Sequence, residues 1–282
     1  MTDRLRALWD FDDLEASEAR LRAQLASEPS AEGRAEVLTQ LARVEGLRGA
    51  FADGERLVLE AESLAGTSAV AAARIELERG RILRSSGNAA EAFPLFESAF
   101  AIALEAGETF VACDAAHMAA LAATDRGTYR SWSERGVELA RSSDDARYWL
   151  GPLLNNLGWE HYEAGEYPEA LEAFRQALAA REEAPENPSA IALARYAVGK
   201  ALRALGRNGE AIPLFEQAVA WADGEGKPDG WFHAELAEGY ADAGRPSEAR
   251  EQAQLAWPLL READSEFGGS EREVRLRSLA GS

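Results

Sequence analysis

The chain repeats itself, and this constrains its fold more than any other feature of the sequence. Residues 87–99 (GNAAEAFPLFESA) and 206–218 (GRNGEAIPLFEQA) share Gly, Glu-Ala, Pro-Leu-Phe-Glu and Ala at equal offsets. Residues 165–177 (GEYPEALEAFRQA) keep the Gly, the Glu-Ala, the Phe and the final Ala. Self-similarity of this kind indicates a stack of similar units, each of which contacts only its neighbours.

A glycine marks the same point in every unit. The six marks are separated by 38, 40, 38, 41 and 38 residues: Gly49, Gly87, Gly127, Gly165, Gly206 and Gly244. On both sides of each glycine lies an Ala/Leu-rich segment of helical period, such as residues 153–164 and 168–181. Glycine tolerates the left-handed backbone that ends a helix, so each unit is expected to be two helices joined by a sharp turn. No segment has the alternation of a strand, and we therefore predict an all-α fold.

The residues around these glycines resemble those of the tetratricopeptide repeat superfamily. The fourth unit fits the family pattern very closely through Leu157, Gly158, Gly165, Tyr167, Ala170, Phe174 and Ala177. The fifth fits nearly as well through Val198, Gly199, Gly206, Ala211, Phe215 and Ala218, and the sixth has Ala253 in place of the aromatic residue. Two units depart further, with Gly54 and Trp132 where alanine is expected. The period also exceeds the roughly 34 residues of the standard repeat; similar long-period arrays occur in bacterial regulators and in motor-protein and spindle adaptors.

The resemblance implies a right-handed α-solenoid superhelix of about six helix-turn-helix repeats over residues 35–263. Residues 1–34 are expected to form an N-terminal capping helix, over residues 13–27. Residues 264–282 are expected to be a C-terminal cap or a flexible tail, in which Ser270 and Glu273 form a candidate capping box for a helix over residues 271–280.

In this family the first helix of each unit lines the concave groove, at positions thirteen, ten, six and three residues before the turn glycine. Six of these positions are basic here and three are acidic, a net charge of +3 in a chain of net charge −19. The candidate partner-binding residues are Asn155, Trp159, Tyr162, Tyr196, Lys200 and Arg203 in the fourth and fifth units, with Arg43, Arg81 and Arg84 in the first and second.

The fourth and fifth units look most like a binding site. Exposed aromatic rings beside arginine are typical of interface hot spots. Lysine, arginine and asparagine together can hold a carboxylate through charge-assisted hydrogen bonds. The alternative is structural: Trp159 would pack between helices, and the basic residues would pair with acids such as Glu160 and Glu163.

Composition narrows the classes of partner and of chemistry. With 49 acidic against 30 basic residues, the chain is expected to repel nucleic acids and anionic membranes. The single cysteine, Cys113, cannot form an internal disulfide. Residues 1–11 have no apolar run like that of a signal peptide, and no stretch approaches the roughly 20 apolar residues that a membrane helix needs. We therefore expect a soluble, cytoplasmic protein. No catalytic motif occurs, the three histidines fit packing or solvated positions with no metal-ligand spacing, and neither an enzyme nor a cofactor is expected.

The sequence thus favours a non-enzymatic scaffold or adaptor that holds a partner segment in its groove, with an acidic segment or a free C-terminus as the preferred ligand. Two alternatives stay open. One is a signalling regulator whose superhelical pitch responds to a peptide. The other is a structural assembly factor that associates with itself, if weakly, through exposed aromatic residues such as Trp9 or Trp257. The partner, the pathway and the oligomeric state are left undetermined.

Overall fold

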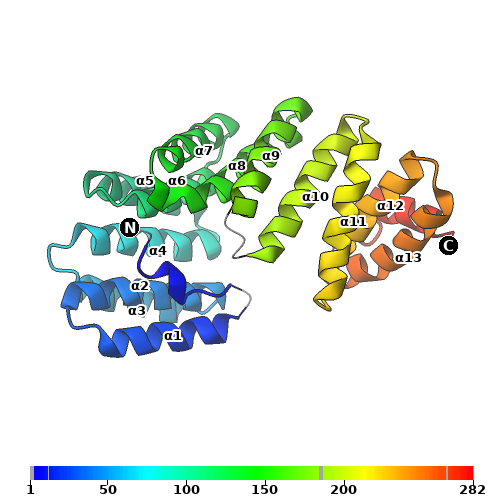
Figure 1. Cartoon of the computed structure of the whole chain (residues 1–282). Helices are drawn as coiled ribbons and strands as arrows, with labels where there is room; N and C mark the ends of the chain where they lie inside the picture. The colour runs from blue at the N-terminus through cyan, green and yellow to red at the C-terminus, as the bar shows by residue number, and fades with distance from the viewer. Residues whose placement is uncertain (1–2, 12, 184–186, 265, 282) are drawn as a thin grey trace. The chain divides into compact units, whose positions relative to one another are not determined.

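The computed structural model describes residues 3–11, 13–183, 187–264 and 266–281 of the 282-residue chain. Their regular secondary structure is entirely helical, which confirms the predicted all-α fold. Contacts divide the chain into two compact units, Met1–Leu153 and Leu154–Ser282. Among the described residues, the helices from α2 to α13 form six consecutive helix pairs (Figure 1).

In the first unit, the described residues form a short 3₁₀ helix near each end and seven α-helices between them. They are η1 (Arg6–Leu8), α1 (Leu14–Ser27), α2 (Ala31–Leu47), α3 (Phe51–Leu64), α4 (Ala69–Ser85), α5 (Ala89–Glu105), α6 (Thr109–Ala122), α7 (Arg126–Arg141) and η2 (Asp144–Trp149). Helix α8 (Leu150–Glu163) begins in this unit and ends in the next.

The second unit continues the same alternation of first and second helices. It contains α9 (Tyr167–Glu183), α10 (Pro188–Ala204), α11 (Asn208–Gly224), α12 (Gly230–Asp242), α13 (Pro246–Ala263) and α14 (Glu271–Ala280). No helix of the described residues combines the length and the apolar character that crossing a membrane would require.

The glycine turns follow the predicted pattern with one exception. Gly49, Gly87, Gly165, Gly206 and Gly244 all have a positive φ, between 71° and 95°. Gly127 does not, and the expectation of a left-handed turn there is wrong. Here the chain leaves α6 through an extended Ala123, and Asp125 caps the next helix by accepting a hydrogen bond from the Thr128 amide at 2.9 Å. A good N-cap thus starts α7 one residue before Gly127, which lies inside the helix.

The repeat signature is explained by one packing relationship. A glycine of the first helix lies beneath a phenylalanine of the second in three pairs: Gly80 with Phe96, Gly158 with Phe174, and Gly199 with Phe215. All three rings are buried. A β-carbon at any of these glycines would lie within 2.4–2.5 Å of the ring. The missing side chain lets the ring sit directly on the first helix, and this interlock builds the core of each pair.

The described segments that flank the array, from residue 3 and up to residue 281, pack onto it. Asp13 caps α1 by accepting a hydrogen bond from the Ala16 amide, and the residues before it bury Leu5 against α2. At the other end Ser270 caps α14, and Glu273 reaches back to accept from the Gly269 amide. Leu276 of α14 is fully buried in a cluster with α12 and α13.

Candidate functional site

The nine predicted site residues lie on first helices, in two groups. Asn155, Trp159 and Tyr162 are on α8, and Tyr196, Lys200 and Arg203 are on α10, all in the second unit. Arg43 is on α2, and Arg81 and Arg84 are on α4, all in the first unit. Five of the first six residues meet in one cluster; Asn155 lies half-buried one helical turn before Trp159.

Lys200 stands at the centre of the cluster in the second unit. Its Nζ atom lies 5.5 Å from the ring centroid of Trp159, 5.3 Å from that of Tyr162 and 5.7 Å from that of Tyr196. An ammonium group at these distances is attracted by the negative faces of the rings. The Trp159 ring also meets Phe174 edge to face, so it is both a core residue and a wall of this cluster. We call Trp159, Tyr162, Tyr196, Lys200, Arg203, Glu235 and Arg272 the Lys200 cluster.

A fully buried carboxylate, Glu235 of α12, joins the cations of this cluster. It accepts a hydrogen bond from Arg203 at 3.0 Å and one from Arg272 at 2.6 Å, and Lys200 Nζ lies at 3.4 Å. Burial alone would raise the pKa of Glu235, but the three positive charges outweigh it and hold the pKa below its ordinary value. Burial also lowers the pKa of Lys200, although Glu235 opposes the shift. One carboxylate thus serves three cations that come from α10 and α14.

The alternative to a binding role was that the basic residues form ion pairs with nearby acids such as Glu160 and Glu163. Pairing is observed, but with other acids: Glu235 for all three cations and, in addition, Asp242 at 3.2 Å for Arg203. Glu235 was missed because its partners come from other repeats. The sequence did hold a signal: Glu235 stands in the largely apolar run WFHAEL, where a buried carboxylate needs a partner.

The first unit carries a second ion-pair cluster, also built around predicted groove positions of first helices. Arg81 of α4 bonds both Glu78 and Asp114, the latter on α6, and these two acids outweigh burial and raise the pKa of Arg81. Arg43 of α2 lies 3.8 Å from Asp114. Burial, aided by the charge of Arg81, lowers the pKa of Arg43. We call Arg43, Arg81, Glu78 and Asp114 the Asp114 cluster. Arg74 of α4 forms a separate ion pair with Glu36 of α2 at 3.4 Å and lines the same cavity as Arg43 and Asp114.

Arg84 belongs to a different arrangement from its predicted companions. Its Nε donates to the carbonyl oxygen of Leu121 at 3.2 Å, at the last turn of α6. An arginine at a helix C-terminus satisfies a carbonyl that has no partner within the helix. The structure therefore gives Arg84 a helix-end contact across neighbouring repeats.

The N-terminal segment, residues 3–11, runs beside α2 and α4 (Figure 1). Its side chains line one cavity together with Arg43 and Asp114. Asp3 forms an ion pair with Arg74 at 2.5 Å, and Trp9 Nε1 donates to Gln40 Oε1 at 3.0 Å. Arg43 sits over the Trp9 ring at 5.2 Å. The expectation of an exposed Trp9 is wrong, because only 7% of it is accessible. The other residue named for self-association, Trp257, is half-buried and donates its indole N–H to Glu273.

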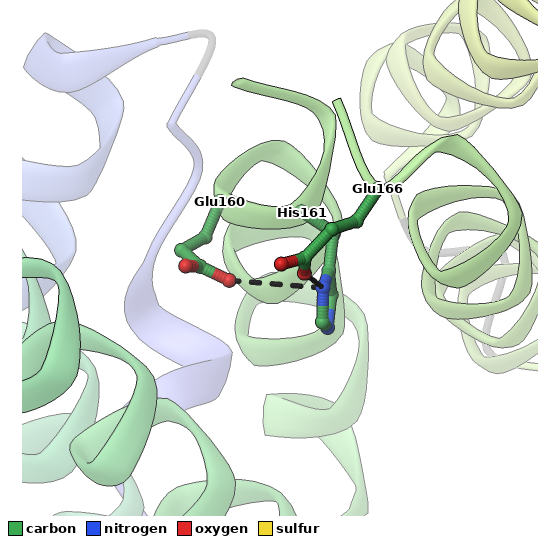
Figure 2. A group of neighbouring side chains, drawn as sticks. All are labelled: Glu160, His161 and Glu166. Atoms are coloured by element: carbon green, nitrogen blue, oxygen red, sulfur yellow. Dashed lines mark hydrogen bonds and ion pairs between the residues drawn. The ribbon is translucent and has the colours of Figure 1, made fainter. Parts of the chain in front are cut away.

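The histidines show one group that the sequence did not suggest. Figure 2 shows His161 between two carboxylates, with Nδ1 at 2.6 Å from Glu166 and 3.8 Å from Glu160. Their ligand atoms lie within 4.8 Å of one another, so these three residues could hold a divalent cation. The turn itself also brings His161 and Glu166 together, because the Glu166 amide donates a hydrogen bond to the His161 carbonyl oxygen across Gly165. Sequence reasoning missed the pair because its spacing spans that turn.

The comparisons with known proteins agree with this geometry. Residues 155–228, which hold the closest matches to the repeat pattern, match a family model of the tetratricopeptide repeat. Residues 155–228 are therefore tetratricopeptide repeats. No curated protein matches its sequence.

Several solved structures share the fold. BtubC (BKLC) from P. vanneervenii is 18% identical, with a TM-score of 0.59 over 76% of this chain and 89% of that one. The signal-transduction ATPase PH0952 from Pyrococcus horikoshii, which has a tetratricopeptide repeat sensor, is 16% identical, with a TM-score of 0.66 over 97% and 43%. The apo form of RapI is 13% identical, with a TM-score of 0.64 over 95% and 80%. At such identities the likeness concerns the fold alone.

Proposed function

We propose that this tetratricopeptide repeat protein is a non-enzymatic scaffold that binds an acidic segment of a partner protein at the Lys200 cluster. The observation that carries the proposal is the convergence of three cations from α10 and α14 on one buried carboxylate of α12, beside aromatic rings of the second unit. The tetratricopeptide fold itself is typical of protein-binding scaffolds and supports the coarser part of the proposal.

Charge favours an acidic ligand. Lys200, Arg203 and Arg272 carry three positive charges and share Glu235, while the chain as a whole has a net charge of −19. Arg203 and Arg272 keep about a quarter to a third of their side chains exposed. Each guanidinium has five N–H donors, so both have donors left for an incoming carboxylate. Such charge-assisted bonds are among the stronger ones in proteins.

The aromatic rings supply the apolar part of the site. Trp159 and Tyr162 are half-buried, and their rings meet at 5.5 Å. On the other side Trp231 lies 4.8 Å beneath the Arg272 guanidinium. Partly exposed tryptophan and tyrosine beside arginine are the residues on which interface affinity concentrates. A ligand with both a carboxylate and an apolar side chain fits this pattern.

Other partners and locations fit less well. The excess of acidic residues opposes binding to nucleic acids and to anionic membranes, so we propose neither as a partner. A cytoplasmic location is proposed because the one cysteine, Cys113, is buried and unpaired, as suits a reducing compartment.

The test uses the full chain and a library of peptides displayed with free C-termini, selected for binding to the wild type. The site variant is Trp159→Ala with Lys200→Met, which leaves Glu235 two arginine partners. The matched control is Trp221→Ala with Lys227→Met, which removes the same residue types from a second helix and from the following turn. Selected peptides should be rich in Asp and Glu and should bind the site variant at least tenfold more weakly than the control. Peptides without acidic residues, or equal affinity for both variants, would contradict the proposal.

A further inference from the structure

We infer that residues 3–11 are an intramolecular ligand: they cover a second binding face, in the first unit, that accepts a partner segment of the same chemistry. That chemistry is an aspartate followed six residues later by Trp-x-Phe, as in Asp3, Trp9 and Phe11. The inference goes beyond the proposed function, because it concerns another face and an occupant already present in the chain.

The segment is seated by its side chains on first-helix positions. The Asp3 carboxylate bonds Arg74 of α4, and both side chains are more than nine-tenths buried. The Trp9 indole bonds Gln40 of α2, and its ring stacks on Phe11 with 5.0 Å between centroids. The acidic group and the indole N–H of the segment therefore each have a specific partner on a first helix.

The receptor positions repeat those of the Lys200 cluster. Arg43, Arg81 and Lys200 each stand six residues before a turn glycine. In the second unit Lys200 lies over aromatic rings of its own face, and in the first unit Arg43 lies over Trp9 and Phe11 at 5.2 and 5.3 Å. The N-terminal segment thus brings to the first unit the aromatic rings that α8 and α10 supply in the second. This is how an external ligand would complete the face.

The backbone of the segment is not integrated into the helix stack. Within the described residues, its amides donate to carbonyls of the segment itself, as from Arg6 to Asp3 and from Trp9 to Arg6, or to side chains such as that of Ser17. Its only regular structure is the three-residue η1. A segment held by side chains can leave without breaking the backbone hydrogen bonds of α2 or α4.

The segment also leaves part of the face unsatisfied. A cavity remains between it and the helices, lined by Phe11, Arg43, Phe110, Asp114 and Trp149. The Trp149 indole N–H is buried and has no hydrogen-bond partner among the described residues. Arg43 has an ion pair at 3.8 Å and ring contacts, but no hydrogen bond to another described side chain. A partner segment with an additional acceptor at this point would complement both donors.

The experiment measures whether the face binds the segment in trans. The probe is a fluorescently labelled peptide of residues 1–13, titrated by anisotropy against the full chain and against an open variant, Asp3→Asn with Trp9→Ala and Phe11→Ala. The tethered segment competes at a millimolar effective concentration. The open variant should therefore bind the peptide at least tenfold more tightly than the wild type does. A peptide with the same three substitutions should bind neither, and Arg74→Gln added to the open variant should lower its affinity again.

A second measurement keeps the inference falsifiable if the open variant does not fold. In the wild type, saturating peptide should displace the segment and speed tryptic cleavage after Arg4 and Arg6, while the substituted peptide should not. A helical open variant that fails to bind the peptide overturns the inference, and so does an unchanged cleavage rate. A concentration-dependent dimer formed by exchange of this segment between copies would also overturn it, because the occupant would then be a second copy of the chain.

Discussion

The ring of Phe174 lies directly on the α-carbon of Gly158, where a β-carbon would come within 2.4 Å of the ring. The contact joins the two helices of the fourth pair and recurs as Gly199 with Phe215. Where the second helix has a small residue instead, as at Ala253, the first helix has Ala237 seven residues before its turn glycine. The two positions thus compensate each other in volume, as close packing requires.

Gly158→Ala should therefore destabilise the protein, although alanine favours a helix. The added methyl forces the Phe174 ring away, which costs about 1–3 kcal/mol, against a gain of about 1 kcal/mol in helix propensity. The matched control is Gly209→Ala in α11, where a β-carbon would meet nothing within 4 Å. In urea unfolding, Gly158→Ala should lower the free energy of unfolding and Gly209→Ala should not. Equal stability of both variants would mean that the ring can shift without cost.

Glu235→Gln should be among the most destabilising changes in the second unit. The glutamine keeps the volume but leaves Lys200, Arg203 and Arg272 around a neutral group in a buried position. Removing one side of a buried ion pair costs about 3–5 kcal/mol. Thermal or urea unfolding measures the loss. The exposed pair of Arg207 and Glu210 provides the control, and Glu210→Gln should leave the stability nearly unchanged because solvent screens this pair. If Glu235→Gln changed the stability as little as this control, the repulsion between the three cations would be weak.

The fold was predictable because its determinants are local and repeat. The turn glycines, the alanines and the phenylalanines each act within one helix pair, so their spacing alone indicates the pairs. The prediction of a left-handed turn at Gly127 was wrong because a second local signal is present. The N-cap formed by Asp125 starts α7 before this glycine.

The candidate site was only partly predictable, since it depends on contacts between repeats. Trp159, Tyr162 and Lys200 could be grouped from their repeat positions. Glu235 could not be identified as their partner, because the periodicity does not say which side chain meets which across neighbouring units. The covering of the first unit by Trp9 has no periodic signal at all, since the segment lies outside the repeats.

The stability of the first unit should fall between pH 7 and pH 5 because of His117. Burial, together with Arg81, Arg43 and Arg84, lowers the pKa of His117 to about 4, although Asp114 opposes the shift. The ordinary pKa of histidine is about 6.5, so between these values the unfolded chain binds the proton and the folded chain does not. Stability is therefore complete above pH 6.5 and is lost as the pH falls toward 4. The loss by pH 5 is about 2 kcal/mol.

The control for this pH dependence is His117→Gln, which cannot take up the proton. Urea unfolding gives the free energy of unfolding of both proteins at pH 7 and pH 5. The loss between the two pH values is then compared between wild type and variant, so that the contributions of other groups cancel. A wild type that loses no more stability than the variant would show that His117 is protonated equally in the folded and unfolded chains.

Lys200→Met should leave the stability nearly unchanged while it weakens ligand binding. Burial penalises the charged amine, as its lowered pKa indicates, and methionine keeps most of the length and apolar contact of the side chain. Glu235 retains two arginine partners in this variant. Because Glu235 keeps these two arginines, the substitution leaves no uncompensated buried charge, which is the cause of the large cost of breaking a buried ion pair. The free energy of unfolding should therefore change by no more than about 1 kcal/mol. The control is Lys227→Met, which removes the exposed lysine in the turn after α11. A loss of about 3 kcal/mol or more at Lys200, with peptide affinity unchanged, would make this lysine a structural residue and would favour the alternative in which the basic residues serve only to pair with acids.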